Sequence, residues 1–118
     1  MGPLQGVVVL DLSRILAGPW ATQALADFGA TVIKIERPGT GDDTRSWGPP
    51  YVKTRDGRDT SESAYFASAN RGKQSVAVDF SQRDGQTIVR RLAERADVFV
   101  EKYKVGSLAR VGLAYSDL

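Results

Sequence analysis

Histidine and cysteine are both absent from the 118 residues of the chain. Without cysteine the chain can form neither a disulfide nor a thiolate nucleophile, which fits a reducing compartment. Without histidine it has no imidazole for acid–base catalysis, no Ser-His-Asp triad and no His/Cys metal site. These absences exclude several common hydrolase and zinc chemistries from the chain, and we expect it to bind no metal.

Long apolar runs and a strong charge of one sign are also missing. No stretch approaches the roughly 20 apolar residues of a membrane-spanning helix, and the N-terminus has no signal-peptide pattern. We therefore expect a cytoplasmic protein that does not contact a membrane. The 16 basic and 14 acidic residues give a net charge of +2, which favours a small polyanionic ligand but is too weak to indicate nucleic-acid binding. The content of 42% hydrophobic and 25% charged residues is ordinary for one globular domain.

The strongest pattern present lies in residues 6–37 and predicts a strand, a helix and a second strand. Val7–Leu10 is a continuous apolar run, as a strand covered on both faces requires. Gly18-Pro19 opens the helix, Gly29 ends it, and Thr31–Glu36 forms the next strand. Helical spacing predicts one buried helix face, made of Ala21, Ala24, Leu25 and Phe28. Such a βαβ unit brings a helix N-terminus beside the carboxyl ends of its strands, where anionic ligands bind.

The rest of the chain continues the alternation of strands and helices. Arg37–Glu62 is polar and rich in Gly, Pro, Asp and Thr, which predicts a long loop that is functional or disordered. Further elements are expected in this order: a short helix over Ser63–Asn70, a strand over Ser75–Phe80, a helix over Gln82–Arg95 that buries Ile88, Val89 and Leu92, and a strand over Asp97–Glu101. This order predicts an α/β fold with a mostly parallel sheet flanked by helices.

The last residues carry a helix signal with no helix behind it. A short turn over Leu108–Val111 ends at Gly112, and Tyr115–Leu118 has the composition of a helix start. We therefore expect residues 1–118 to be the N-terminal portion of a larger domain in a truncated chain; a frayed C-terminus is the alternative.

Three features of the loop region have more than one interpretation. Glu36 ends the second strand, where a dinucleotide-binding fold holds the ribose, but no G-x-G-x-x-G follows the first strand and NAD binding is disfavoured. Asp42 and Asp43 suggest paired carboxylates, although in a glycine-rich loop we expect turn formers rather than metal ligands. Trp47, in the sequence WGPP, either covers an active-site mouth or fills a groove.

Three long stretches in a fixed order carry a family resemblance. VLDLSRILAGPWATQALADFGATVIKIERPGTGDDTRSWGPP, YFASANRGKQSVAVDF and ADVFVEKYKVGSLARVGL resemble the N-terminal part of the class III CoA-transferases. That family includes the formyl-CoA:oxalate, carnitine and succinyl-CoA:dicarboxylate CoA-transferases and is related to the α-methylacyl-CoA racemases. The resemblance covers Leu4–Leu118 and implies a Rossmann-like domain, with an interlocked homodimer of longer chains.

The resemblance also implies which residues contact coenzyme A: Leu16, Ala17, Arg37, Val78, Ser81, Lys102, Tyr103, Lys104 and Arg110. An arginine suits phosphate because its guanidinium offers paired donors, and it can also stack on adenine. Gly18 would let the backbone of the first loop approach the ligand closely. CoA and acyl-CoA are then substrates, together with a carboxylic acid, and no cofactor is bound permanently.

Each of these residues also has a structural interpretation. Arg37, Lys102 and Lys104 can be solvated cations, and Arg110 can pair with Glu101 or Asp117 on the surface. Tyr103 can pack in the core instead of stacking on adenine.

The family's reaction uses an aspartate that attacks the acyl-CoA carbonyl and passes through an acyl-aspartyl anhydride and an aspartyl-CoA thioester. By resemblance that aspartate lies beyond Leu118, so we name no catalytic residue and expect the chain alone to be inactive. The GDDTRSWGPP loop resembles members that use dicarboxylic acids. A racemase of the same fold and a non-catalytic nucleotide-binding or assembly fragment are the alternatives.

Overall fold

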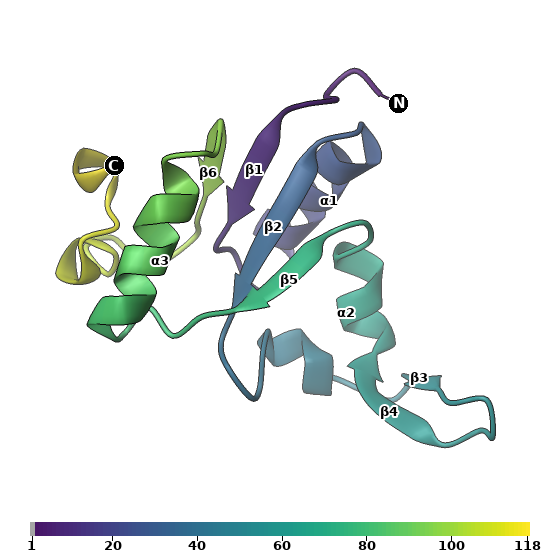
Figure 1. Ribbon diagram of the computed structural model, residues 1–118. Helices are drawn as coiled ribbons and strands as arrows, with labels where there is room; N and C mark the ends of the chain where they lie inside the picture. Colours follow the sequence, from purple (N-terminus) through teal and green to yellow (C-terminus); the bar gives the residue numbers. More distant parts are fainter. Residues whose placement is uncertain (1) are drawn as a thin grey trace.

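The computed structural model describes residues 2–118, and its centre is a four-stranded parallel sheet (Figure 1). The strands stand in the order β5-β2-β1-β6, with β1 at Val8–Asp11, β2 at Thr31–Glu36, β5 at Gln74–Ala77 and β6 at Val98–Val100. Every neighbouring pair is parallel; Leu10, for example, is in register with Ile33 on one side and Phe99 on the other. The predicted α/β fold is confirmed, although the ends of the elements differ from the predicted ones by a few residues.

The chain changes direction once as it builds this sheet. From β1 it moves outward through β2 to β5, and it then returns to add β6 on the other side of β1. The reversal lies between β1 and β6. In open α/β sheets, ligands bind outside the carboxyl ends of the strands at such a point.

Helices cover both faces of the sheet (Figure 1). Helix α1 (Ala17–Asp27) packs over Val9 and Val32, and helix α3 (Arg83–Ala93) covers the other face, where Val89 meets Leu10. The short α2 (Ala64–Ala69) and the 3-10 turns η2 (Ala109–Val111) and η3 (Tyr115–Asp117) complete the helical elements outside the loop after β2. No helix within residues 2–118 has both the length and the apolar character needed to cross a bilayer.

The predicted buried face of α1 is right only at Leu25, which is half-buried and packs against Val9 and Val32. Its four residues are exposed or only half-buried: Ala21, Ala24, Leu25 and Phe28, the last at 55% exposure. The helix instead buries Thr22 and Gln23, because polar partners lie beneath them. The Thr22 hydroxyl donates to Asp11, and the Gln23 amide donates to the carbonyl of Ser68. Hydrogen bonding, rather than apolar spacing, therefore sets the rotation of this helix.

The predicted buried face of α3 is right in part. Val89 is fully buried and Leu92 is half-buried, but Ile88 is 47% exposed. Ile88 comes directly before Val89, and consecutive residues of a helix point in different directions. Its side chain therefore points away from the sheet that Val89 faces.

The polar segment after β2 is more regular than expected. It contains a 3-10 turn, η1 (Asp43–Ser46), and an antiparallel hairpin of β3 (Tyr51–Lys53) and β4 (Asp59–Ser63). Figure 1 shows this hairpin apart from the parallel sheet. Its second strand has the sequence DTSES, in which Thr60 is the one β-branched residue and no residue is aromatic, so little marks it as a strand in the sequence.

Candidate functional site

Two adjoining hollows lie at the carboxyl edge of the sheet, and we call them together the rim cleft. The first, of about 300 Å³, is lined by Ser13, Arg14, residues 34–37, Gly41, Asp42, residues 78–81 and Tyr103. The second, of about 400 Å³, is lined by Leu12, Arg14, Ile15, Leu16, Ala17, Lys102 and Tyr103. Arg14 and Tyr103 line both hollows, so the two lie on either side of these side chains. The second hollow sits at the β1/β6 reversal, where a ligand is expected.

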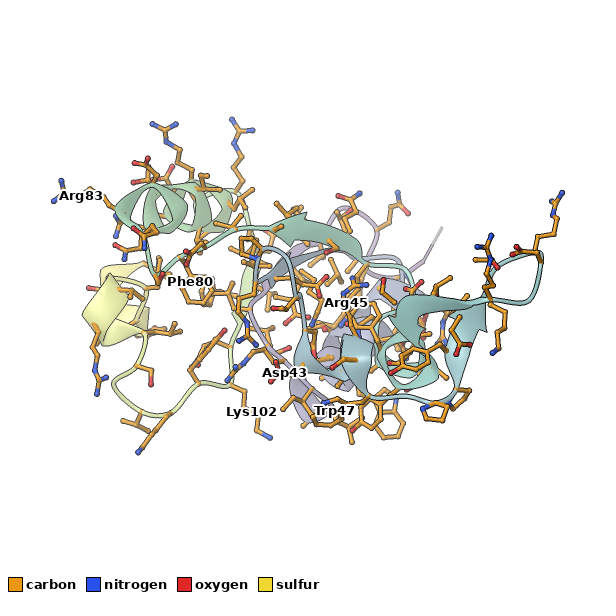
Figure 2. The ribbon with its side chains drawn as sticks, turned by 90° about the horizontal axis from the view of Figure 1, so that it is seen from below. Asp43, Arg45, Trp47, Phe80, Arg83 and Lys102 are labelled. Atoms are coloured by element: carbon orange, nitrogen blue, oxygen red, sulfur yellow. The ribbon has the colours of Figure 1, made fainter. Side chains whose placement is uncertain are left out.

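Most of the predicted contact residues meet in the rim cleft. Arg37, Val78 and Ser81 line the first hollow, Leu16, Ala17 and Lys102 line the second, and Tyr103 lines both. They come from the loops after β1, β2, β5 and β6. Figure 2 looks onto this edge of the sheet and shows Phe80 and Lys102 around it.

Two predicted residues lie outside the rim cleft. Lys104 lines a neighbouring hollow of about 790 Å³ between the end of β6 and the C-terminal turns. Arg110, on η2, is exposed and lines none of these three hollows. The two carboxylates considered as its partners accept backbone N–H groups instead, Glu101 from Tyr103 and Asp117 from Ala114.

An aromatic and cationic stack separates the two hollows. The Arg14 guanidinium carbon lies 4.9 Å from the centre of the Tyr103 ring, and Phe80 meets that ring edge-on with centroids 5.9 Å apart. Burial raises the pKa of Tyr103, and the charges of Arg14 and Arg37 oppose this effect. Tyr103 thus packs against its neighbours and also lines the cleft. Arg14 was absent from the predicted contact set, although its place just after β1 matches the strand-end position that singled out Arg37.

Arg37 stands at the outer edge of the first hollow. Its guanidinium pairs with Asp43 at 2.5 Å, and both side chains are about half exposed. An exposed pair of this kind contributes little to stability. One guanidinium nitrogen is engaged by Asp43, which leaves further donors that a phosphate group can use.

A buried polar network forms the floor of the rim cleft. Lys34, in the middle of β2, donates to the Ser13 carbonyl at 3.0 Å and lies 2.9 Å from an Asp42 carboxylate oxygen. Burial alone would raise the pKa of Asp42, but the Thr44 N–H and the Lys34 ammonium outweigh it and lower that pKa. Sequence reasoning missed this pair, although a lysine inside the apolar strand TVIKIE was a usable signal.

A second buried pair lies beside the first. Asp11 accepts the Thr22 hydroxyl at 2.5 Å and the Ser13 N–H at 2.8 Å, and Lys73 approaches it at 3.3 Å. Burial lowers the pKa of Lys73 to about 8, while the Asp11 carboxylate opposes this shift. The end of β1 is therefore fixed to both α1 and the segment before β5.

Glu36 is not free to hold a ribose. Arg45 donates to both of its carboxylate oxygens at 2.8 and 2.7 Å, the Asp42 N–H donates at 2.8 Å, and the Ser75 hydroxyl donates as well. Burial would raise the pKa of Glu36, but these hydrogen bonds lower it to about 2. All of its strong acceptor positions are used inside the protein, which argues against the NAD interpretation.

The remaining loop residues also have structural partners. Asp42 caps η1 by accepting the Thr44 N–H at 3.0 Å, as a turn-forming residue does. Trp47 packs edge-to-face on Tyr65 of α2, with ring centroids 5.3 Å apart. Within residues 2–118 no three acidic side chains gather as metal ligands would. A Cβ on Gly18 would lie 2.3 Å from the Ser13 Cβ, so the close approach at Gly18 is to Ser13.

Several known proteins are similar to this chain over almost all of its length. The sequence model of CoA-transferase family III matches residues 4–118. The succinyl-CoA:glutarate CoA-transferase of Mus musculus is 56% identical over 118 residues, which is all of this chain and 26% of that protein. The succinate–glutarate CoA-transferase of Agrobacterium fabrum is 52% identical over 98% of this chain and 29% of its own length.

A solved structure is similar over the same range. The crystal structure of a CAIB/BAIF family protein from Brucella suis superposes with a TM-score of 0.90 at 49% identity, covering 98% of this chain and 30% of that one. The chain thus spans between a quarter and a third of the length of these proteins.

Proposed function

Since this chain belongs to CoA-transferase family III, we propose that the protein containing it moves coenzyme A between an acyl-CoA thioester and a dicarboxylic acid. One observation carries the proposal: Arg14, Arg37 and Lys102 converge from three separate loops on the rim cleft. A cleft at the carboxyl edge of a parallel sheet with cations from several loops suits a ligand that carries several phosphates. The relatives named for succinyl-CoA and glutarate support a C4–C5 dicarboxylic acid as the acceptor.

In this proposal each part of the cleft has a role in holding CoA. Arg37 and Arg14 offer forked donors to the phosphates, and Lys102 adds a point charge. The aromatic pair of Phe80 and Tyr103 offers an apolar wall to the adenine or the pantetheine arm. Arg110 and Lys104 lie outside the cleft and would contact CoA only if its nucleotide extends beyond the cleft.

The reacting carboxylate is proposed to lie on residues beyond Leu118. Its attack on the acyl-CoA carbonyl forms an acyl-aspartyl anhydride and releases CoA, which then attacks the aspartyl carbonyl to give an aspartyl-CoA thioester and expels the donor carboxylate. The acceptor carboxylate attacks this thioester, forms a second anhydride and again releases CoA. Attack of CoA on the acyl carbonyl of that anhydride gives the new acyl-CoA and restores the aspartate. Glu36 and Asp42 are poor nucleophiles because both oxygens of each accept hydrogen bonds. The same proposal includes an interlocked homodimer of the full-length protein.

The test is an exchange assay on the full-length protein with succinyl-CoA and glutarate. We expect glutaryl-CoA and succinate as products, and no exchange by residues 1–118 alone. Epimerisation of a 2-methylacyl-CoA without exchange would instead indicate a racemase. Calorimetry with CoA and NAD separates both from a different nucleotide-binding role; binding of NAD but not CoA would contradict the proposal.

A further inference from the structure

The loop between β1 and α1 contains a strained residue. Ile15 has φ of +75°, and it is the one residue other than glycine with positive φ within residues 2–118. A β-branched side chain is disfavoured in this left-handed region, so the conformation persists only where surrounding contacts impose it. Ile15 stands between Arg14 and Leu16, and all three line the rim cleft.

A buried ion pair from β2 and the following loop imposes this conformation. The Ile15 N–H donates to Asp42 Oδ2 at 3.2 Å and, at 3.4 Å, to Oδ1. Oδ2, the nearer oxygen, lies 2.9 Å from Lys34 Nζ. Lys34 Nζ also donates to the Ser13 carbonyl at 3.0 Å, two residues before Ile15. The ion pair therefore grips the loop on both sides of Arg14.

The position of the ion pair is itself fixed. The other oxygen of Asp42 accepts the N–H and the hydroxyl of Thr44 at 3.0 and 2.8 Å. The side chains of Lys34 and Asp42 are each 1% exposed. A ligand in the cleft thus has almost no direct access to either charge, and the pair can act only through the loop that it holds.

We propose that the Lys34–Asp42 ion pair is a positioning element for the rim cleft, which holds Ile15 in the left-handed conformation so that Arg14, Leu16 and Ala17 face a bound CoA. The identity of the ligand rests on the proposed function. We call this ion pair the clamp. Without it, Ile15 relaxes toward negative φ, and only a fraction of the molecules keep the loop in the conformation that binds CoA. The apparent dissociation constant then rises by the inverse of that fraction.

The central variant is Asp42→Asn in the full-length protein, with CoA affinity measured by calorimetry. The oxygen that Thr44 binds remains, but an NH2 group replaces Oδ2, which is the nearer acceptor of the Ile15 N–H and the partner of Lys34. We expect the Kd for CoA to rise about tenfold or more. Val32→Ala is the control for stability, because Val32 is buried on the α1 face of the sheet; this variant should lose stability and keep its Kd.

A rescue separates positioning from general damage. In the Asp42→Asn background, Ile15→Gly should recover most of the CoA affinity, because glycine adopts positive φ without a steric cost. Ile15→Ala removes almost the same side-chain atoms but keeps a Cβ, so it should not recover it. Equal recovery by glycine and alanine, or a wild-type Kd for Asp42→Asn, would overturn the proposal.

A further measurement needs neither Asp42→Asn nor CoA. In the otherwise wild-type protein, Ile15→Gly should have a higher urea midpoint than Ile15→Ala, although glycine ordinarily stabilises less than alanine through its unfolded-state entropy. An equal or lower midpoint for Ile15→Gly overturns the proposal. If the wild-type protein binds no CoA, the proposed function fails, and this comparison still tests whether the fold holds residue 15 in the left-handed conformation.

Discussion

At the scale of single residues, the charges of the rim cleft fall into two classes. Lys34, Asp42 and Glu36 are buried and satisfied within the protein, whereas Arg37 and Lys102 are exposed. Buried ionic groups cost much when one partner is removed, and exposed ones cost little. Substitutions in the first class should therefore lower the stability of the fold. Those in the second class should lower only the affinity for the ligand.

Arg37→Gln tests the second class. We expect CoA affinity to fall about tenfold, because charge-assisted hydrogen bonds to phosphate are lost. The free energy of unfolding should change by less than about 1 kcal/mol, because the ion pair with Asp43 is exposed. Calorimetry and urea unfolding measure the two effects.

Asp43→Asn is the matched control for Arg37→Gln, since it breaks the same ion pair from the other side. It should leave stability unchanged and keep or tighten CoA binding, because the guanidinium is no longer shared. An unchanged Kd in Arg37→Gln would remove Arg37 from the site.

At the scale of elements, the packing of α3 against the loop after β5 controls the first hollow. A Cβ on Gly85, in the first turn of α3, would lie 1.9 Å from the Asp79 carbonyl oxygen and 3.0 Å from the Phe80 nitrogen. Residues 78–81 line the hollow. Because Gly85 has no side chain, the first turn of α3 can pack directly against the backbone of this loop.

Gly85→Ala should therefore destabilise the protein by about 1–3 kcal/mol through overpacking, even though alanine is normally the better helix former. CoA affinity should fall as well, because Val78 and Ser81 shift with the loop. Gln86→Ala, one residue further along α3, is the control and should change neither quantity. Thermal unfolding checks the first effect, and a higher melting temperature for Gly85→Ala would contradict it.

The elements also show how far the sequence could predict the structure. Strands β1, β2 and β6 are rich in apolar and β-branched residues, so their existence followed from the sequence. That the sheet is parallel followed from the alternation of strands and helices. The buried face of α1 did not, because Thr22 and Gln23 are turned inward by hydrogen bonds to Asp11 and to Ser68, which are distant in sequence or lie on other elements. The β3/β4 hairpin was missed because β3 has only three residues and β4 is polar throughout, with Thr60 as its one strand-favouring residue.

For the cleft too, some residues could be predicted from the sequence and others could not. The family resemblance singled out Arg37, Ser81 and Lys102, and because each follows a strand end, a parallel sheet brings them to one edge. The clamp of Lys34 and Asp42 depends on a turn that returns Asp42 to the end of β2, which no local pattern specifies. Arg110 lies on η2, away from that edge, and its contact with CoA stays a prediction.

At the scale of the whole molecule, the buried carboxylates make the fold sensitive to acid. The pKa of Glu36 lies at about 2 against an ordinary value of 4.5, so the unfolded chain binds more protons than the folded one between these values. Its contribution to stability is complete above the unfolded value and is lost as the pH falls toward the folded one. The shift corresponds to about 3 kcal/mol, and Asp42, whose pKa is also lowered, adds to it in the same direction.

We therefore expect the free energy of unfolding to fall steeply from about pH 5 to about pH 2. Glu36→Gln should be destabilised by about 3 kcal/mol near neutral pH, because Arg45 loses its buried partner, and its stability should depend less on acid. Urea unfolding at several pH values measures both slopes. Parallel slopes for the two proteins would show that Glu36 does not carry the acid sensitivity.

The order β5-β2-β1-β6 also bears on protein engineering. Because four parallel strands that are far apart in the sequence end at the same edge, the walls of the cleft are encoded in four widely spaced stretches. Grafting any single loop from a relative would transfer only one wall of the cleft. The contacts of Lys34 and Asp42 with the loop after β1 would then join segments from two different proteins. In a chimera designed to change substrate or nucleotide preference, the two parent sequences should therefore be joined outside residues 8–104. All four loops of the cleft then come from the same parent.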